Sequence, residues 1–233
     1  MIIQDNLRKV FSSIEETCRK SNRSPKDVIV VAVTKTVMLD VIQQAIDAGI
    51  VNIAENRVQE AENKFPSLLA QNPNIKTYII GHLQTNKAKD AIAVCSLIQS
   101  VDSLKLAQEI EKQAAKRGQV VEILVQFNTA REEQKFGADP KDSNVLIESI
   151  SQLSHVHIKG VMCMAPYTED QGIIRKTFSD LRGIRDEVKV RFGGHPQVEM
   201  GVLSMGMSSD YKIAIEEGST MVRIGSAIFK AEE

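Results

Sequence analysis

The sequence predicts an α/β protein that forms a single (β/α)8 TIM barrel, in which helices surround eight closed parallel strands. About eight short apolar runs alternate with segments of helical periodicity along the whole chain, a pattern typical of a parallel sheet. The length of 233 residues suits one such barrel. No G-x-G-x-x-G motif follows an apolar run, which weakens the alternative of an open dinucleotide-binding sheet. We expect one domain over residues 1–233, with an extra helix at its amino end.

The predicted strands are short runs rich in β-branched residues, as strands buried on both faces are. The clearest is the unbroken apolar run over residues 28–33, which precedes a helical pattern that ends near Gly49. The run over residues 120–127 is the next clearest. The eight predicted strands cover residues 28–33, 50–54, 76–80, 97–101, 120–127, 157–162, 198–203 and 220–224.

Helices are predicted from apolar residues at helical spacing and from signals at the helix ends. Residues 3–18 carry apolar residues on one face and charges on the other, which indicates an amphipathic helix and not a signal peptide. Ser103 is a favourable capping residue, and Pro140 suits a first helical turn. Gly183 marks a potential interruption. The predicted helices cover residues 3–18, 41–46, 56–69, 85–93, 104–117, 140–153 and 168–190.

The composition excludes several classes of protein. The formal net charge is -1, whereas a general nucleic-acid surface needs a basic excess. No apolar segment is long enough to cross a bilayer. The three cysteines show neither disulfide nor metal spacing, which favours a reducing compartment, so we expect a cytoplasmic protein with no metal. Tryptophan is absent and aromatic residues are few, which argues against a platform for stacked bases.

Lys35 is the first candidate for chemistry. It follows the first predicted strand directly, at the carboxyl edge where such folds place their active sites. Apolar walls around a lysine at this edge would remove its solvation and favour the neutral, nucleophilic amine that a Schiff base requires. The alternative is a lysine that merely extends from a strand end into solvent.

Small residues after the last two strands predict an anion cradle. Ser204 and Ser208 follow the seventh strand, and Gly225 and Ser226 follow the eighth, each segment leading towards a helix amino terminus. Barrels commonly bind phosphate after these two strands. Each feature alone is compatible with an ordinary cap or turn. Opposite a strand-end lysine, the set points to a phosphate-bearing aldehyde, which is pyridoxal 5′-phosphate.

Arg223 shares a strand face with Gly225 and is expected to point inward near the cradle. Its guanidinium could contact either the phosphate or the pyridine nitrogen of that cofactor. At the nitrogen it would oppose protonation of the ring and make the ring a weaker electron sink. The alternative is an ion pair with a carboxylate such as Glu199 on the neighbouring strand.

Several long motifs resemble the YggS/PROSC family of pyridoxal phosphate homeostasis proteins, over essentially the full chain. One small departure is Ala54, where many relatives have glycine, so the backbone there is less free. The resemblance implies a fold type III barrel like the amino-terminal domain of alanine racemase, with no second domain. The matching motifs are residues 32–35, 54–60, 80–87, 160–166, 203–211 and 222–229.

The resemblance also implies a role for individual residues. Lys35 would carry the cofactor as an internal aldimine, and Arg223 would reach the ring nitrogen or the phosphate. The phosphate would bind to Ser204, Gly225 and Ser226. The pocket would be lined by Asn56, Met162 and Ser208.

The function that this resemblance implies is a non-enzymatic, monomeric carrier that buffers pyridoxal phosphate or delivers it to apoenzymes. The alternative is an amino-acid racemase or decarboxylase that uses the same cofactor; a weaker one is a sugar-phosphate isomerase with Lys35 as base or electrophile. Racemases and decarboxylases with this barrel carry a further β domain that brings a second acid/base residue to the ring. The last motif lies a few residues before Glu233, so we expect a one-sided site. The sequence does not exclude a weak pyridoxal phosphate-dependent side activity on amino acids.

Three histidines receive minor roles. We expect His82, at a strand end, to pack beside the cofactor or bond to the next helix, with general-base catalysis as the alternative. His155 and His157 share a strand face, yet no third ligand lies near them in the sequence, so we expect no metal there.

Overall fold

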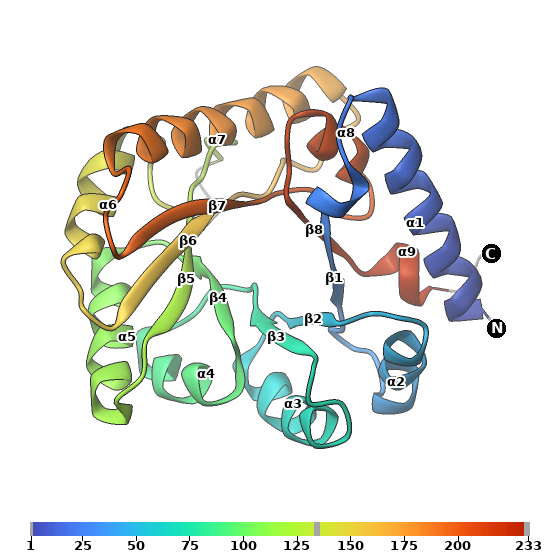
Figure 1. The fold of residues 1–233 in the computed structure, drawn as a ribbon, viewed down its shortest axis with the longest axis horizontal. Coiled ribbons are helices and arrows are strands. Elements are labelled where there is room, and N and C mark those ends of the chain that lie inside the picture. Colours follow the sequence, from blue (N-terminus) through green and yellow to red (C-terminus); the bar gives the residue numbers. More distant parts are fainter. Residues whose placement is uncertain (1, 133–135, 231–233) are drawn as a thin grey trace.

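The computed structural model describes residues 2–132 and 136–230, which form a closed barrel of eight parallel strands in sequential order. Helices surround the barrel (Figure 1). The predicted (β/α)8 barrel is therefore confirmed. The first residue and the last three of the predicted domain lie outside the described residues.

All eight predicted strands are present, and each observed end lies within two residues of its predicted position. The barrel closes where the first and last strands pair, with Val31 opposite Arg223 and Ala32 opposite Ile224. This register brings the segments that follow these two strands side by side at the carboxyl end. The strands are β1 (Ile29–Val33), β2 (Asn52–Glu55), β3 (Lys76–Ile79), β4 (Leu97–Val101), β5 (Val121–Gln126), β6 (Val156–Met162), β7 (Val198–Ser204) and β8 (Met221–Ile224).

Each predicted helix is present, and the short helices Tyr211–Glu216 and Ser226–Phe229 lie outside the predicted ranges. The segments predicted as helices from residues 85 and 140 begin as short 3-10 turns, Thr85–Lys87 and Pro140–Asp142. The helix that contains Gly183 is unbroken, so the potential interruption there was wrong. The helices are α1 (Ile2–Lys20), α2 (Leu39–Asp47), α3 (Val58–Gln71), α4 (Ala88–Val94), α5 (Leu104–Arg117), α6 (Ser143–Ser151), α7 (Gln171–Arg191), α8 (Tyr211–Glu216) and α9 (Ser226–Phe229), with a further 3-10 turn at Pro25–Asp27.

The long amino-terminal helix α1 lies beside the last helix of the chain, α9 (Figure 1). Its buried face includes Leu7, Val10 and Ile14, as the amphipathic pattern predicts. The buried side chain of Asn6 donates hydrogen bonds of 3.0 Å to the carbonyls of Ile228 and Lys230. The extra helix therefore holds the segment that follows β8, which is one wall of the predicted site.

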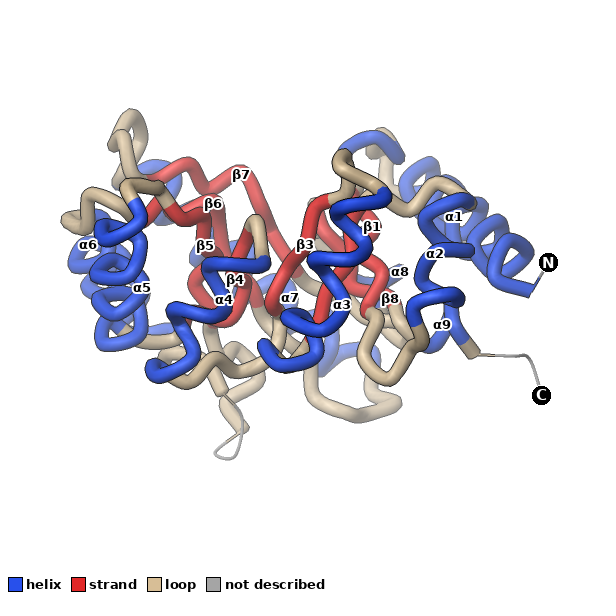
Figure 2. Tube along the Cα trace, turned by 90° about the horizontal axis from the view of Figure 1, so that it is seen from below, coloured by secondary structure: helices blue, strands red, loops and turns tan. Residues whose placement is uncertain are grey.

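The core has two parts. A large cluster lies between the strands and the surrounding helices. A smaller one fills the barrel interior, where Val31, Tyr78, Leu124 and Met221 contribute from different strands. In Figure 2 the strands lie inside the ring of helices, and long loops gather at the lower edge. Within the described part of the chain, no helix combines the length and the apolar character needed to span a membrane.

Candidate functional site

A cavity with a volume of about 880 Å³ lies at the carboxyl end of the barrel. Six of the eight predicted site residues lie on its wall, and they come from β8 itself and from the segments after β1, β2, β7 and β8. The lining residues are Val33, Lys35, Asn56, Ile80, Gly81, His82, Gln126, Phe136, Met164, Tyr167, Met207, Ser208, Ser209, Arg223, Gly225, Ser226 and Lys230. The barrel thus gathers residues that are up to 197 positions apart in the sequence, from Val33 to Lys230.

Lys35 occupies a tight turn at the end of β1. The amide of Val37 donates to the carbonyl of Thr34 at 3.0 Å, which places Lys35 and Thr36 at the two central positions. Thr36 has a φ of +61°, a left-handed conformation that is unusual for a β-branched residue. Lys35 itself is exposed, so the expected burial by apolar walls was wrong. The physical reason is that Lys35 lies in a turn beyond Val33, the last residue of β1, at the carboxyl end of the barrel where the cavity lies.

Three of the four residues of the predicted anion cradle, Ser208, Gly225 and Ser226, lie together where the segment after β7 meets the start of α9, and their binding of an anion stays a prediction. The hydroxyl oxygen of Ser208 accepts hydrogen bonds from the amides of Gly225 and Ala227, each at 3.3 Å. A side chain at position 225 would place a Cβ 3.3 Å from the carbonyl oxygen of Val33, so β8 and β1 approach closely there. Backbone amides that converge on one oxygen atom form a site suited to an anion.

Arg223 is anchored in the floor of the cavity. Its guanidinium donates to the hydroxyl of Ser204 at 2.6 Å and to the carbonyl of Cys163 at 2.8 Å. Burial lowers the pKa of Arg223 from its ordinary value, and the nearby Asp210 carboxylate opposes that change. The alternative of an ion pair with Glu199 was wrong, because Glu199 binds Lys159 at the other end of the barrel.

Asp210 supports the segment that follows β7. This residue is only 5% exposed, and its carboxylate accepts a hydrogen bond from the amide of Met207 at 2.5 Å. Burial raises the pKa of Asp210, while the Met207 amide and the Arg223 guanidinium act in the opposite direction. The carboxylate therefore fixes the loop that carries Ser208 and lies in the field of the buried guanidinium.

Two predicted site residues lie below the cavity and are not among the residues that line it. Ser204 is fully buried between Arg223 and Gln99, to which its hydroxyl donates at 2.7 Å. Met162 is fully buried in the barrel interior, whereas Met164 lines the cavity. Residues two positions apart share a strand face, so Met162 lies one layer deeper than Met164. Their assignment as cofactor-binding residues remains a prediction.

The wall opposite the cradle contains His82, which is stacked on Phe136 with ring centroids 3.9 Å apart. Nδ1 of His82 lies 3.4 Å from the carboxylate of Asp102. His82 therefore lies on the cavity wall, whereas the expected bond to the next helix was wrong, because its partner Asp102 lies in the loop between β4 and α5. Phe136 carried no sequence signal because it lies in a loop, whereas Gln126 could have been found as a polar residue at the end of an apolar strand.

His155 and His157, the pair of histidines noted in the sequence, are not part of a metal site among the described residues. Nδ1 of His155 lies 2.8 Å from the carboxylate of Glu111, a partner on α5. Among residues 2–132 and 136–230 no group of three or more His, Cys, Asp or Glu residues could hold a metal ion.

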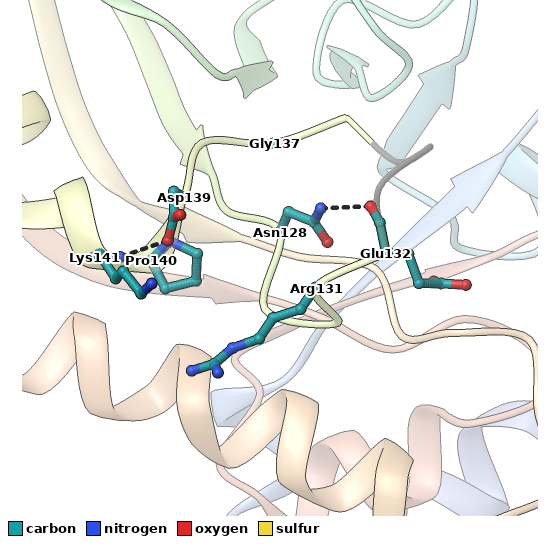
Figure 3. A pocket seen from close by; sticks show the side chains of 7 residues that line it. All are labelled: Asn128, Arg131, Glu132, Gly137, Asp139, Pro140 and Lys141. Carbon is teal, nitrogen blue, oxygen red and sulfur yellow. Dashed lines mark hydrogen bonds between the residues drawn. The ribbon is translucent and has the colours of Figure 1, made fainter.

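A second, smaller cavity of about 290 Å³ lies along the loop that follows β5 (Figure 3). Arg131, Glu132, Asp139 and Lys141 give its wall mixed charge. Asn128 donates from its side chain to the carbonyl of Glu132 at 2.8 Å, which closes the loop on itself (Figure 3). This cavity contains none of the predicted site residues.

Comparison with known proteins gives one consistent family. Residues 8–233 match the model described as alanine racemase, N-terminal domain. A protein of Aquifex aeolicus named pyridoxal phosphate homeostasis protein is 36% identical over 225 residues, which cover 97% of this chain and 96% of the relative.

Comparison with solved structures gives similarity to the same kinds of protein. PipY of Synechococcus elongatus, solved with PLP bound, is 32% identical with a TM-score of 0.84, and the match covers 98% of this chain and all of PipY. An alanine racemase of Clostridium difficile is 16% identical with a TM-score of 0.75, which shows a shared fold alone. The match covers 98% of this chain and 60% of the racemase.

Proposed function

Because this chain belongs to the family of pyridoxal phosphate homeostasis proteins, built on the alanine racemase N-terminal domain, we propose that it binds pyridoxal 5′-phosphate and buffers or delivers it in the cell. The observation that carries the proposal is a lysine and an anion cradle on the wall of one cavity. Lys35 is on the β1 side, and Ser208 with Gly225 is on the β7 and β8 side.

The cavity fits this cofactor in size and in its donor groups. Its volume of about 880 Å³ lies within the range of ligand sites in proteins. The dianionic phosphate would bind at the amides of Gly225 and Ala227, where the hydroxyl oxygen of Ser208 already accepts two hydrogen bonds. Ser226, which is exposed at the start of α9, offers a further hydroxyl.

Lys35 would hold the cofactor covalently. When bound, the cofactor would supply an electrophilic aldehyde carbon, and the amine of Lys35 would hold that carbon covalently with release of water. Exposure of Lys35 supports a reversible role, since water and a recipient group reach the same bond. Asn56, on the neighbouring wall after β2, would contact the ring.

Arg223 would act on the ring and not on the phosphate. Its guanidinium is held towards Ser204 and the carbonyl of Cys163, at the floor, whereas the cradle amides lie at the start of α9. A fixed positive charge at the ring nitrogen keeps that nitrogen unprotonated, and the ring then withdraws electrons less strongly. Ser204 would support this arrangement from below, and Met162 would support the wall formed by Met164.

We further propose that the protein is a carrier and not an enzyme, and that it acts in the cytoplasm as a monomer with apoenzymes as recipients. The names of the relatives support the carrier role. A pyridine ring whose nitrogen is kept unprotonated by Arg223 withdraws electrons weakly, and this also disfavours formation of a carbanion on a bound amino acid. Turnover of any common amino acid by racemisation or decarboxylation at about one per second or faster would defeat the carrier role.

The decisive experiment is borohydride reduction of the yellow, cofactor-loaded protein, followed by peptide mapping. We expect the label on the peptide that contains Lys35, and no covalent label in Lys35→Ala. Lys230 lines the same cavity and serves as the matched control, so Lys230→Ala should label like the unmodified protein. A protein that stays colourless with added pyridoxal phosphate, or a label on Lys230 alone, would overturn the proposal.

A further inference from the structure

A partly buried ion-pair network lies directly beneath the turn that carries Lys35. The ammonium of Lys64, on α3, is 2.8 Å from the carboxylate of Glu55 and 3.2 Å from that of Glu60. The Glu55 side chain, at the end of β2, is fully buried, and that of Lys64 is 14% exposed. The network therefore joins β2 to α3 at the edge of the cavity, next to the lining residue Asn56.

The same network is bonded to the turn on both sides of Lys35. The ammonium of Lys64 donates to the carbonyl of Thr34 at 2.9 Å, and the hydroxyl of Thr34 donates to Glu55 at 2.7 Å. The amide of Thr36 donates to the carboxylate of Glu60 at 3.4 Å. Thr36 has the left-handed backbone that a threonine rarely adopts, so surrounding contacts must hold it. Thr34 and Thr36 are the residues that set the direction in which Lys35 leaves the barrel.

A gain in folding stability does not by itself explain why this ion-pair network is present. A buried ion pair is rarely more stable than apolar residues of the same shape, because both charges lose their hydration. Burial raises the pKa of Glu55, with Lys64 and Thr34 opposing the change, and Oε2 of Glu55 has no hydrogen-bond partner among the described residues. A charged group kept in so unfavourable a place is expected where orientation of a reactive group matters.

We infer that Glu55 and Lys64 are positioning residues, which aim the amine of Lys35 at the aldehyde of the bound cofactor by fixing the Thr34–Thr36 turn. The inference rests on the proposed function, since it concerns the reaction of Lys35 with that aldehyde. Neither residue is among those that line the cavity, so their effect passes through the turn.

The test separates covalent capture from simple binding. Glu55→Gln and Lys64→Met are each titrated with pyridoxal phosphate and with 4′-deoxypyridoxine 5′-phosphate, which has the ring and phosphate but no aldehyde. We expect formation of the yellow adduct to slow by about tenfold or more, because a small misplacement of a reacting group has a large effect on rate. Circular dichroism of the visible band should weaken as the adduct loses its fixed orientation. Binding of the deoxy compound should stay within about twofold, since the cradle is unchanged.

The barrel offers a matched control at its opposite end. Lys159 also lies between two glutamates, Glu122 and Glu199, and its side chain is 22% exposed. Lys159→Met removes a comparable ion pair without touching the Lys35 turn and should leave capture of pyridoxal phosphate unchanged. If Lys64→Met does not fold, Glu60→Gln replaces it, because Glu60 is 31% exposed and also bonds to the turn.

Three results would overturn the inference while leaving the proposed function intact. In the first, the network variants capture pyridoxal phosphate as fast as the unmodified protein. In the second, their affinities for pyridoxal phosphate and for the deoxy compound fall by the same factor. In the third, Lys159→Met slows capture as much as the network variants do. The second and third results would make the network merely structural. Absence of any yellow adduct in the unmodified protein is a different outcome, because it defeats the proposed function and the inference with it.

Discussion

Replacement of Gly81 by alanine probes how tightly the cavity wall is built. Gly81 lies just after β3 and lines the cavity. A Cβ at this position would stand 2.2 Å from the carbonyl oxygen of Asn56 and 3.0 Å from its Cα. These are backbone atoms, so no side-chain rotation relieves the clash.

The size of the effect follows from that geometry. The Asn56 oxygen and the new Cβ must separate by at least about 1.2 Å to reach ordinary van der Waals contact. Overpacking of this kind costs about 2 kcal/mol. In a protein of 233 residues this lowers the melting temperature by about 4–8 °C. The displacement also moves Asn56, so affinity for pyridoxal phosphate should fall by about tenfold, which corresponds to about 1.4 kcal/mol.

Thermal unfolding and cofactor titration measure the two effects on Gly81→Ala. Gly183→Ala is the matched control, because a Cβ at position 183 meets no atom within 4 Å and the residue lies inside α7. Alanine there should stabilise the helix by about 0.5–1 kcal/mol and leave affinity unchanged. A Gly81→Ala protein with the melting temperature and affinity of the unmodified protein would refute the reasoning.

Two further predictions concern buried titratable groups. Burial raises the pKa of Tyr78 to about 12, so its contribution to stability is complete below about pH 10 and is lost as pH rises through 12. Tyr78→Phe should abolish the tyrosinate absorbance step near pH 12, which is readily seen because the chain has no tryptophan; an unchanged titration would contradict the burial. Burial also raises the pKa of Cys163, to about 12, and raises that of Cys18, so neither thiol should react quickly with a disulfide reagent at pH 8 until the protein unfolds. Rapid native labelling mapped to either cysteine would count against the packing described.

Much of the site could be predicted because strand ends in a barrel converge. Once β1 and β8 were recognised, Lys35, Arg223, Gly225 and Ser226 had to lie at the same end of the molecule. The depth of each residue was harder to predict. Ser204 was expected at the surface of the cradle, but it is buried one level lower, where it accepts a hydrogen bond from Arg223.

The sequence by itself determined which residues form strands and helices and which strand ends carry lysine, arginine and small residues, because periodicity and end signals are local properties. Only the tertiary structure decided that Lys35 is exposed, that Arg223 binds Ser204 and not Glu199, and that Lys64 holds the turn before α2. These contacts depend on register and helix packing between distant segments. The closed barrel as a whole determines which distant segments come into contact, and these contacts leave no pattern in any single stretch of the chain.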